Sequence, residues 1–562
     1  MRTTSLLFAF LAAAVCSGQT NTTPEYAEVI AAYTAIAKSN AKTARLTETG
    51  ITDAGLPLHT LVIDPAGRFD PKRSRDKGDL VCLIMNGIHP GEPCGIDAAL
   101  DFAEKAAQNP KDGVVYVIIP IYNIGGALNR SGVLRANQNG PEEYGFRGNA
   151  KNYDLNRDFI KSDARNTFAF AEVFHTWQPH IFLDTHTSNG ADYQPNLSLI
   201  STFPERLHPM QAGVLTRELL PALYSAMVAA GEPMVPYVNT RKGTPESGIN
   251  AFTDLPRYGT GYAAMWGTIG FITEAHMLKP YGKRVAATRT FMHVLDSLIH
   301  PNRDKIVALK KVAERGAAEA RTFTTRWSLG DEADSVTFAG YRADSIRSEV
   351  TGQMRIRYNR DRPYTEKTAH YNTHLPEGEY ELPAAFIIPQ GYTEIADRLR
   401  ANGIRMRTLT ADSTAEVTAT YITDFETVDA PYEGHYLHYN TKTRTRKVPL
   451  EFRKGDIVVL CNQPGNRYLA HVFDPASDDS FFNWNFFDGV LMQKEYFSGY
   501  LFEDTAAEIL RRNTMLSKKF EEKKKSDPDF AGDAGAQLDF IYKNSKYYEP
   551  THMRLPVFRV EN

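Results

Sequence analysis

Short apolar runs, separated by segments with helical periodicity, constrain the fold of the N-terminal half most strongly. The strand-like runs are LHTLVIDP (58–65), LVCLIMN (80–86), VVYVIIPIYN (114–123), HIFLDTH (180–186) and TIGFITEAH (268–276). Several are apolar on both faces, which is typical of strands covered by helices on each side. Helix-like segments lie between them, at 93–108, 163–177, 211–231 and 283–299. We therefore predict an α/β domain with a mixed β-sheet and helices on both faces.

The pattern changes after residue 302. Residues 303–322 read as a linking helix, and the chain then becomes rich in Thr, Val, Tyr and Arg. Alternation favours antiparallel strands in 323–375 and 415–455, with strand–helix–strand in 384–409 and a buried strand in 455–463. Residues 515–540 begin as a charged helix and are expected to pass into a loop. These features predict a smaller, β-rich α+β domain in the C-terminal half.

Length, charge and cysteine content limit the functional classes. A chain of 562 residues is too long for one ordinary core, so we expect two or three domains. The formal net charge of -3 gives no electrostatic case for binding nucleic acid or an anionic membrane. Outside the N-terminus, Cys82, Cys94 and Cys461 are too few for a disulfide framework. Cys82 and Cys94 could form a disulfide bridge, but we expect them to be two buried free thiols.

The N-terminus has the organisation of a signal peptide. Arg2 precedes an apolar stretch from Leu6 to Val15, and the small residues Ser17 and Gly18 follow. We predict export to the periplasm or the medium, with residues 1–18 removed. A lipoprotein anchored through Cys16 is the alternative. No other stretch is long and apolar enough to span a membrane.

Four reactive side chains follow or end the predicted strands. His89 and Glu92 come directly after strand 80–86, His186 ends strand 180–186, and Glu274 lies near the end of strand 268–276. Ligands of open α/β sheets bind outside the carboxyl ends of the strands, so these side chains should meet at one edge. Two imidazoles and one carboxylate form the open ligand set of a catalytic zinc site. Asp154 is a candidate partner for the second ring nitrogen of a ligand histidine.

At this point the sequence resembles a known family, the zinc carboxypeptidases of the carboxypeptidase A-like class (M14 family). The resemblance rests on four pieces in the family's order, which together cover most of residues 55–300. These pieces are HPGE (89–92), RGNAKNYDLNRDF (147–159), LDTHT (183–187) and GFITEAH (270–276). It implies a zinc peptidase domain at 19–302, followed by a linking helix and β-rich segment at 303–380 and an accessory α+β domain at 381–562.

The resemblance also implies the identity of the metal ligands and of the groups next to them. His89, Glu92 and His186 match the ligands of one Zn²⁺ ion. Asp154 matches the carboxylate that orients the first ligand histidine. Glu274 matches the general base that, with zinc, makes a water nucleophilic.

The resemblance implies further residues that contact the substrate, a peptide with a free C-terminal carboxylate. Asn156 and Arg157 match the pair that binds this carboxylate, and a guanidinium can do so bidentately. Arg147 matches the arginine that stabilises the oxyanion, with Arg135 as a rival. Tyr258 and Tyr262 are both candidates for the tyrosine that caps the substrate. The region that borders the side-chain pocket should include Ser247, Gly248, Thr253 and Gly259.

The leading interpretation is therefore an exported metallocarboxypeptidase, and two alternatives stay open. The same site could hydrolyse peptidoglycan peptides or another amide. The chain could instead be a non-catalytic peptide-binding protein that keeps the fold. The aromatic segment 471–489, rich in Phe and containing Trp484, is expected to pack a domain interface rather than bind sugar.

Overall fold

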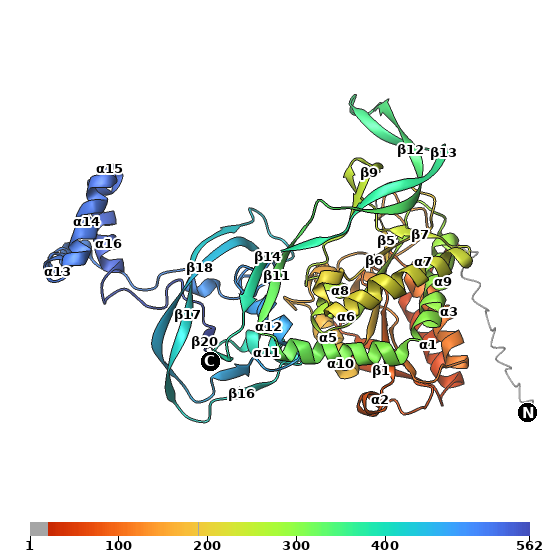
Figure 1. Cartoon of the computed structure of the whole chain (residues 1–562), viewed down its shortest axis with the longest axis horizontal. Coiled ribbons are helices and arrows are strands. Elements are labelled where there is room, and N and C mark those ends of the chain that lie inside the picture. Colours follow the sequence, from red (N-terminus) through yellow and green to blue (C-terminus); the bar gives the residue numbers. More distant parts are fainter. Residues whose placement is uncertain (1–20, 189, 562) are drawn as a thin grey trace, which may run out of the picture.

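A computed structural model describes residues 21–188 and 190–561, and the predicted signal peptide and Cys16 lie outside these ranges. Within them an eight-stranded mixed sheet forms the centre of the N-terminal domain (Figure 1). The strands occur in the order β1 (Ala44–Ile51), β2 (Pro57–Ile63), β4 (Val114–Ile119), β3 (Leu80–Met85), β5 (Ile181–Ser188), β10 (Ile269–His276), β6 (Leu197–Ser201) and β7 (Met234–Pro236). β4, β3, β5 and β10 are mutually parallel, and their carboxyl ends meet at one edge.

Both faces of the central strands are buried, as the sequence predicts. Along β3, Val81, Leu83 and Met85 belong to one apolar cluster, whereas Leu80 and Ile84 belong to the cluster on the opposite face. This alternation follows from the two-residue period of a strand. The elements that cover the second face are α1 (Tyr26–Ser39), α3 (Cys94–Gln108), α7 (Leu220–Ala229), α9 (Tyr281–Ile299) and α10 (Arg303–Glu319).

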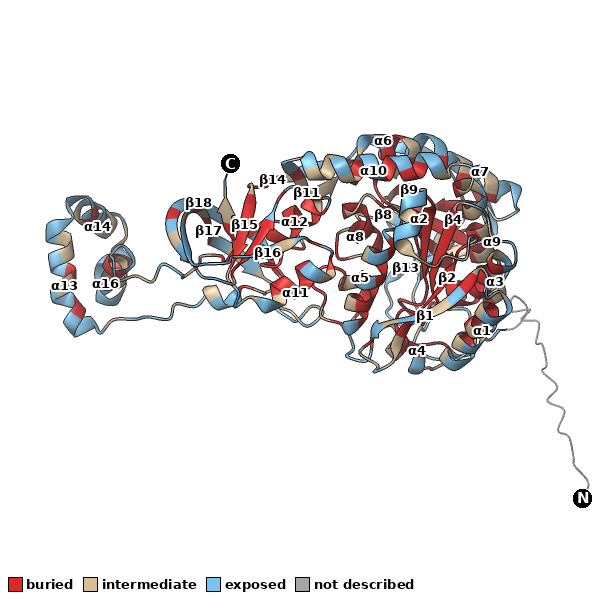
Figure 2. Cartoon of the chain, turned by 90° about the horizontal axis from the view of Figure 1, so that it is seen from below, coloured by how far each residue is buried: buried red, intermediate tan, exposed pale blue. Residues whose placement is uncertain are grey.

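The first face is covered by helices and by the C-terminal domain together. The helices are α5 (Arg165–Trp177) and α8 (Gly259–Met265). Their apolar cluster continues without a break into side chains of the C-terminal domain, such as Leu399 and Trp484. The predicted role of the aromatic segment 471–489 in a domain interface is therefore confirmed. Figure 2 shows buried residues on both sides of this junction.

The short helical elements of the N-terminal domain connect these layers. They are α2 (Pro71–Lys77), α4 (Ile124–Leu128), η1 (Leu155–Arg157), η2 (Pro204–Arg206), α6 (Pro209–Val214) and η3 (Leu215–Leu219). The segment 303–322, predicted as a linking helix, contains α10, which packs on the N-terminal domain. Its Lys310 Nζ donates to the carbonyl oxygen of Trp266 at 2.8 Å, and Ile306 and Val307 are buried.

The antiparallel strands predicted from the alternating pattern of the C-terminal half are present. Among the described residues they belong to three further sheets, one of which includes two strands of the N-terminal domain. A six-stranded sheet has the order β16 (Met406–Thr408), β19 (Ile457–Leu460), β15 (Ala385–Ile388), β20 (Phe558–Val560), β17 (Ser413–Thr427) and β18 (His438–Phe452). It packs with α11 (Thr393–Ala401) and α12 (Asn466–Phe473). β11 (Thr322–Leu329) pairs with β14 (His374–Glu381). β12 (Asp334–Arg347) and β13 (Met354–Tyr371) form a projecting hairpin (Figure 1). β13 pairs with β9 (Thr244–Asn250), and β9 pairs with β8 (Asn239–Lys242), so the four strands form one sheet.

The prediction that residues 515–540 end in a loop is wrong. This region is helical throughout most of its length, in α14 (Thr514–Ser526), α15 (Pro528–Gly532) and α16 (Ala534–Lys543), after α13 (Gly499–Arg512) and η4 (Asp488–Val490). The side chains of Asp527 and Asp533 each accept a backbone N–H and cap the next helix, so the chain starts a new helix where a loop is predicted. Pro528 occupies the first turn of α15, where proline is tolerated.

The structure also bears on the cysteines and on membrane-spanning helices. Cys82, Cys94 and Cys461 are buried free thiols, so the Cys82–Cys94 bridge is excluded. Among the described residues, no helix is long and apolar enough to cross a membrane.

We expect Leu399→Ala to destabilise the protein by about 2–5 kcal/mol, because it opens a cavity in the cluster that joins the two domains. Leu399 is fully buried there. Urea unfolding followed by tryptophan fluorescence measures the change. Val350→Ala is the control, since Val350 is 94% exposed and should change stability by less than about 0.5 kcal/mol. Equal midpoints for both variants would contradict the shared core.

Candidate active site

The turn after β3 delivers the first two predicted ligands. β3 ends at Met85, and Gly87 adopts a left-handed conformation (φ 65°) that glycine accepts without steric cost. The N–H of Glu92 donates to the carbonyl oxygen of His89 at 2.8 Å, so both side chains leave one tight turn. The following helix, α3, packs very closely on β5, because a Cβ on Gly95 would lie 2.0 Å from Oγ1 of Thr185.

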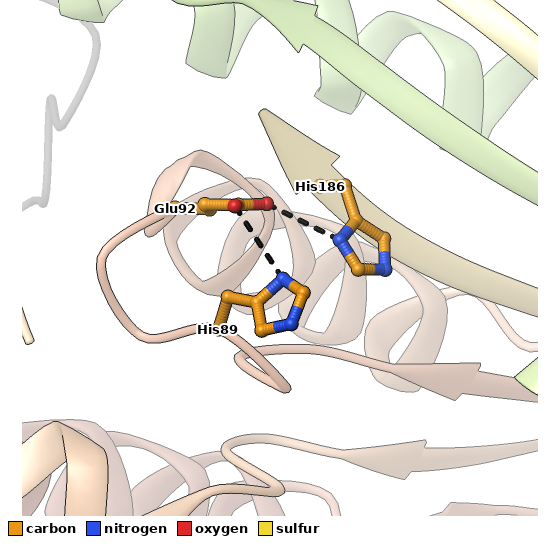
Figure 3. A group of neighbouring side chains, drawn as sticks. All are labelled: His89, Glu92 and His186. Atoms are coloured by element: carbon orange, nitrogen blue, oxygen red, sulfur yellow. Dashed lines mark hydrogen bonds and ion pairs between the residues drawn. The ribbon is translucent and has the colours of Figure 1, made fainter. Parts of the chain in front are cut away.

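His186 reaches the same point from β5. His89, Glu92 and His186 are all buried, and one ligand atom from each lies within 4.8 Å of the others. Nδ1 of His89 lies 3.4 Å from Oε1 of Glu92, and Nδ1 of His186 lies 3.2 Å from Oε2. Figure 3 shows both imidazoles with Nδ1 turned toward the Glu92 carboxylate.

Each imidazole is oriented by a carboxylate on its other nitrogen. Nε2 of His89 lies 2.9 Å from Oδ1 of Asp154, and Nε2 of His186 lies 2.9 Å from Oδ2 of Asp184. With Nε2 as the hydrogen-bond donor, Nδ1 of the neutral imidazole can offer its lone pair to a metal at the centre of the group. Nδ1 of His89 is buried and has no hydrogen-bond partner among the described residues. This donor set fits a divalent metal such as zinc.

Asp184 was not singled out from the sequence. Its signal is positional: it lies two residues before His186 in the same strand, so both side chains are on one face. Asp154, in contrast, is expected from the sequence to lie beside His89, and it does. Its Oδ2 accepts from Nε of Arg147 at 2.9 Å, and its Oδ1 also accepts the N–H of Asn156 at 2.9 Å.

The charges of the metal-free site compensate one another. Burial raises the pKa of Glu92, but Arg135 and His89 outweigh it and hold that pKa well below its usual value. Burial lowers the pKa of His186, but Asp184 and Glu92 outweigh it and hold that pKa well above its usual value. His186 is therefore protonated near neutral pH in the metal-free protein, and a metal must displace this proton.

Glu274 faces the same pocket from β10. In the parallel pairing of β10 with β5, Glu274 lies opposite His186. Burial, with smaller contributions from the charges of Glu92 and Asp184, raises the pKa of Glu274 to about 8. A cation bound between His89, Glu92 and His186 would oppose this shift, because a positive charge favours the ionised carboxylate.

A pocket of about 370 Å³ contains the predicted residues together. Its polar lining includes His89, Glu92, Arg135, Arg147, Asn156, Arg157, His186 and Glu274. The apolar part of its lining includes Ile200, Tyr237, Phe252, Tyr258, Ile272 and Met277. Tyr237 and Phe252 are lining residues that the sequence did not indicate. Of the region 247–259, the described lining contains Phe252 and Tyr258, and it does not contain Ser247, Gly248, Thr253 or Gly259.

The two candidate tyrosines occupy different environments. Tyr258 lines the pocket, and the Arg157 guanidinium lies 4.7 Å from the centre of its ring. Tyr262 is 1% exposed in the core, and its hydroxyl is 2.7 Å from Nε2 of His175 and 2.6 Å from Oδ1 of Asn402. The prediction of Tyr262 as a substrate-capping residue is therefore wrong: Tyr262 lies inside α8 and packs in the core, whereas Tyr258 precedes the helix with an extended backbone.

We expect the affinity for Zn²⁺ to rise as pH increases from 6 to 8, by about tenfold per pH unit for each proton released. The reason is the raised pKa of His186, which leaves a proton on the imidazole that zinc must displace. Calorimetric titrations in two buffers with different ionisation enthalpies would count the protons.

The matched variants for this titration are His186→Ala and His300→Ala. His186→Ala should abolish high-affinity binding, and His300→Ala, at the end of α9, should leave it unchanged. Zinc at 100 times its dissociation constant should stabilise the native protein by about 2.7 kcal/mol. Binding that survives in His186→Ala, or binding without proton release, would contradict the assignment.

Comparisons with known proteins give matches among solved structures alone. No protein-family model matches the chain, and no curated protein matches it either. A metallo-carboxypeptidase from Burkholderia cenocepacia is 17% identical, with a TM-score of 0.36, over 49% of this chain and 69% of that one. Carboxypeptidase A from Helicoverpa armigera is 14% identical, with a TM-score of 0.36, over 50% and 74%.

A metallo-carboxypeptidase from Pseudomonas aeruginosa, in complex with (2-guanidinoethylmercapto)succinic acid, is 14% identical, with a TM-score of 0.35. That match covers 49% of this chain and 68% of that one. These three likenesses leave about half of the chain without a counterpart. Over the other half, the chain is similar to metallo-carboxypeptidases.

Proposed function

We propose that this protein is a zinc-dependent metallocarboxypeptidase that hydrolyses the C-terminal peptide bond of peptides. One observation supports this function above the others: the group His89, Glu92 and His186 shares a single pocket with Glu274 and Arg157. The pocket thus combines a metal ligand set, a carboxylate that can accept a proton, and a guanidinium that can bind a substrate carboxylate.

Zinc held by the Nδ1 atoms of His89 and His186 and by Glu92 would supply a Lewis acid that lowers the pKa of water to near 7. Glu274 is the base that takes the proton from the attacking water. A carboxyl that has accepted this proton can then deliver it to the leaving amine.

Arg147 is the group best suited to stabilise negative charge on the scissile carbonyl oxygen. Nε and Nη2 of Arg147 are held by Asp154 at 2.9 Å each, and its side chain is 44% exposed and lines the pocket. The rival, Arg135, is already engaged through all three nitrogens. Its partners are Glu92 at 2.8 Å, Gln138 at 2.9 Å and the carbonyl oxygen of Thr187 at 3.3 Å. The third nitrogen of Arg147, Nη1, lies 3.5 Å from Oε1 of Glu92, a longer contact than the 2.8 Å between Arg135 and the same carboxylate. Arg147 therefore keeps more capacity to bind an oxyanion.

Asn156 and Arg157 bind the terminal carboxylate in this proposal. Oδ1 of Asn156 is buried without a hydrogen-bond partner among the described residues, so no bond to this oxygen fixes the amide, and its Nδ2 can donate to a substrate carboxylate. Arg157 stacks on Tyr258, a position that limits its motion and leaves Tyr258 beside the substrate. The apolar walls formed by Ile200, Phe252 and Ile272 favour substrates with a large apolar C-terminal side chain.

Glu274→Gln should lower kcat for release of C-terminal amino acids from peptides by about 10²–10⁴-fold, because the amide cannot accept the proton from water. Zinc content should stay equal to that of the wild type, since Glu274 is not a proposed ligand. Chromatography of released phenylalanine or leucine, with and without a chelator, measures the activity. Glu319→Gln, an exposed residue at the end of α10, is the matched control. Chelator-resistant activity, or full activity in Glu274→Gln, would refute the mechanism.

Arg157→Lys should reduce kcat/KM for peptides with a free carboxylate by about 10–150-fold, because a lysine loses the bidentate pair and the stacking on Tyr258. Most of this loss should be a higher KM. The same variant should act on C-terminally amidated peptides about as slowly as the wild type does. Parallel assays with acid and amide forms of one peptide test this, and an equal loss on both forms would argue against carboxylate binding by Arg157.

A further inference from the structure

The C-terminal domain reaches the segment that carries the substrate-binding residues. The turn between β17 and β18 brings Glu433 to this segment, where its Oε2 accepts the backbone N–H of Asp154 at 2.8 Å. The two residues are 279 positions apart in the chain. In Figure 1 the sheet that contains β17 and β18 lies on the side of the molecule away from α9.

The turn that presents Glu433 is held in an uncommon conformation. Glu433 has φ 50° and Gly434 has φ 84°, and Tyr432 and His435 exchange backbone hydrogen bonds of 2.7 and 3.1 Å. A glutamate in the left-handed region is disfavoured unless its surroundings hold it there. Gly434 lies against the ring of Tyr153, because a Cβ on it would be 3.0 Å from that ring.

Neighbouring contacts fix the chain that follows the substrate-binding pair. Asp163 receives His435 Nε2 at 2.7 Å and Arg398 Nη2 at 3.0 Å, both from the C-terminal domain. Fully buried Lys161 bridges Asp158 and Asp163 with contacts of 2.7 and 2.9 Å. The C-terminal domain therefore anchors residues 158–163 as well as the N–H of Asp154.

A second contact between the domains supports the ring on which Arg157 stacks. The buried Asp479 accepts the N–H of Arg257 at 3.0 Å and forms an ion pair of 2.8 Å with its side chain. The guanidinium of Arg257 also lies 5.1 Å from the centre of the Trp484 ring. The next residue in the chain is Tyr258. The C-terminal domain therefore holds the backbone at Asp154, three residues before Arg157, and the backbone at Arg257, next to the tyrosine on which Arg157 stacks.

We propose that the C-terminal domain completes the active site and that Glu433 is a positioning residue for the segment 153–157. This inference rests on the proposed carboxypeptidase function. Asp154 orients His89 through Oδ1 and Arg147 through Oδ2, and Arg157 follows three residues later. A bond that fixes the Asp154 backbone therefore acts on the zinc ligand and on the carboxylate-binding arginine at the same time.

Three substitutions of Glu433 separate its hydrogen bond from its charge. Glu433→Gln keeps an acceptor at the same reach without the charge. Glu433→Asp keeps the charge on a side chain too short for the bond, and Glu433→Ala removes both. Glu426→Ala, on the exposed part of β17 with Asn440 as its partner, is the matched control.

We expect the Ala and Asp variants to lower kcat/KM for free-acid peptides by about tenfold, because the zinc ligand and Arg157 both lose support. The Gln variant and the control should behave like the wild type. Hydrogen exchange of a peptide covering 153–157, measured on the metal-free full-length protein, should speed up in the Ala and Asp variants alone. Thermal unfolding midpoints identify any variant that has lost its fold.

The two readouts distinguish a failure of this inference from a failure of the proposed function. Wild-type exchange in Glu433→Ala, or a Gln variant as impaired as the Ala variant, would overturn the positioning role. A wild-type protein that releases no C-terminal residue would refute the carboxypeptidase proposal. In that case faster exchange in the Ala and Asp variants, with normal exchange in the Gln variant, would still support the positioning of 153–157 by Glu433.

Discussion

The site depends on one arrangement, in which each buried imidazole is tied through Nε2 to a carboxylate of its own. Asp154 orients His89 and Asp184 orients His186. These bonds leave both Nδ1 atoms facing Glu92, so the group is preformed for a cation before one binds. Such a concentration of buried charge is costly unless it is paired, and the surrounding arginines provide that pairing in the metal-free state.

The rest of the fold holds these carboxylates and imidazoles in place. Parallel pairing of β3, β5 and β10 brings three distant segments to one sheet edge, with Glu274 opposite His186. The close packing of α3 on β5 at Gly95 fixes the turn that carries His89 and Glu92. Asp154 is the exception, because it lies in an irregular segment, and there the C-terminal domain supplies the support through Glu433.

This dependence changes how the C-terminal half is interpreted. Its sequence suggested an accessory domain without chemistry of its own, and its side chains do not line the described pocket. Nevertheless, its apolar cluster is continuous with that of the α/β domain, and its buried Asp479 pairs with Arg257 beside Tyr258. The helices α13–α16 differ, because they pack around a small apolar cluster of their own.

The sequence by itself determined five strands of the central sheet (β2, β3, β4, β5 and β10, but not β1, β6 or β7), the helices on both faces of the sheet, and the residue types at the strand ends. These features depend on local periodicity and on the rule that parallel strands share an edge, so they can be read from the chain. Tertiary structure decided that Tyr258 and not Tyr262 lines the pocket. The spacing of either tyrosine from Glu274 would allow it to reach the site, and only the packing of the core buries Tyr262. It also decided the bond from Glu433 to Asp154, since no local pattern relates residues so far apart in the chain.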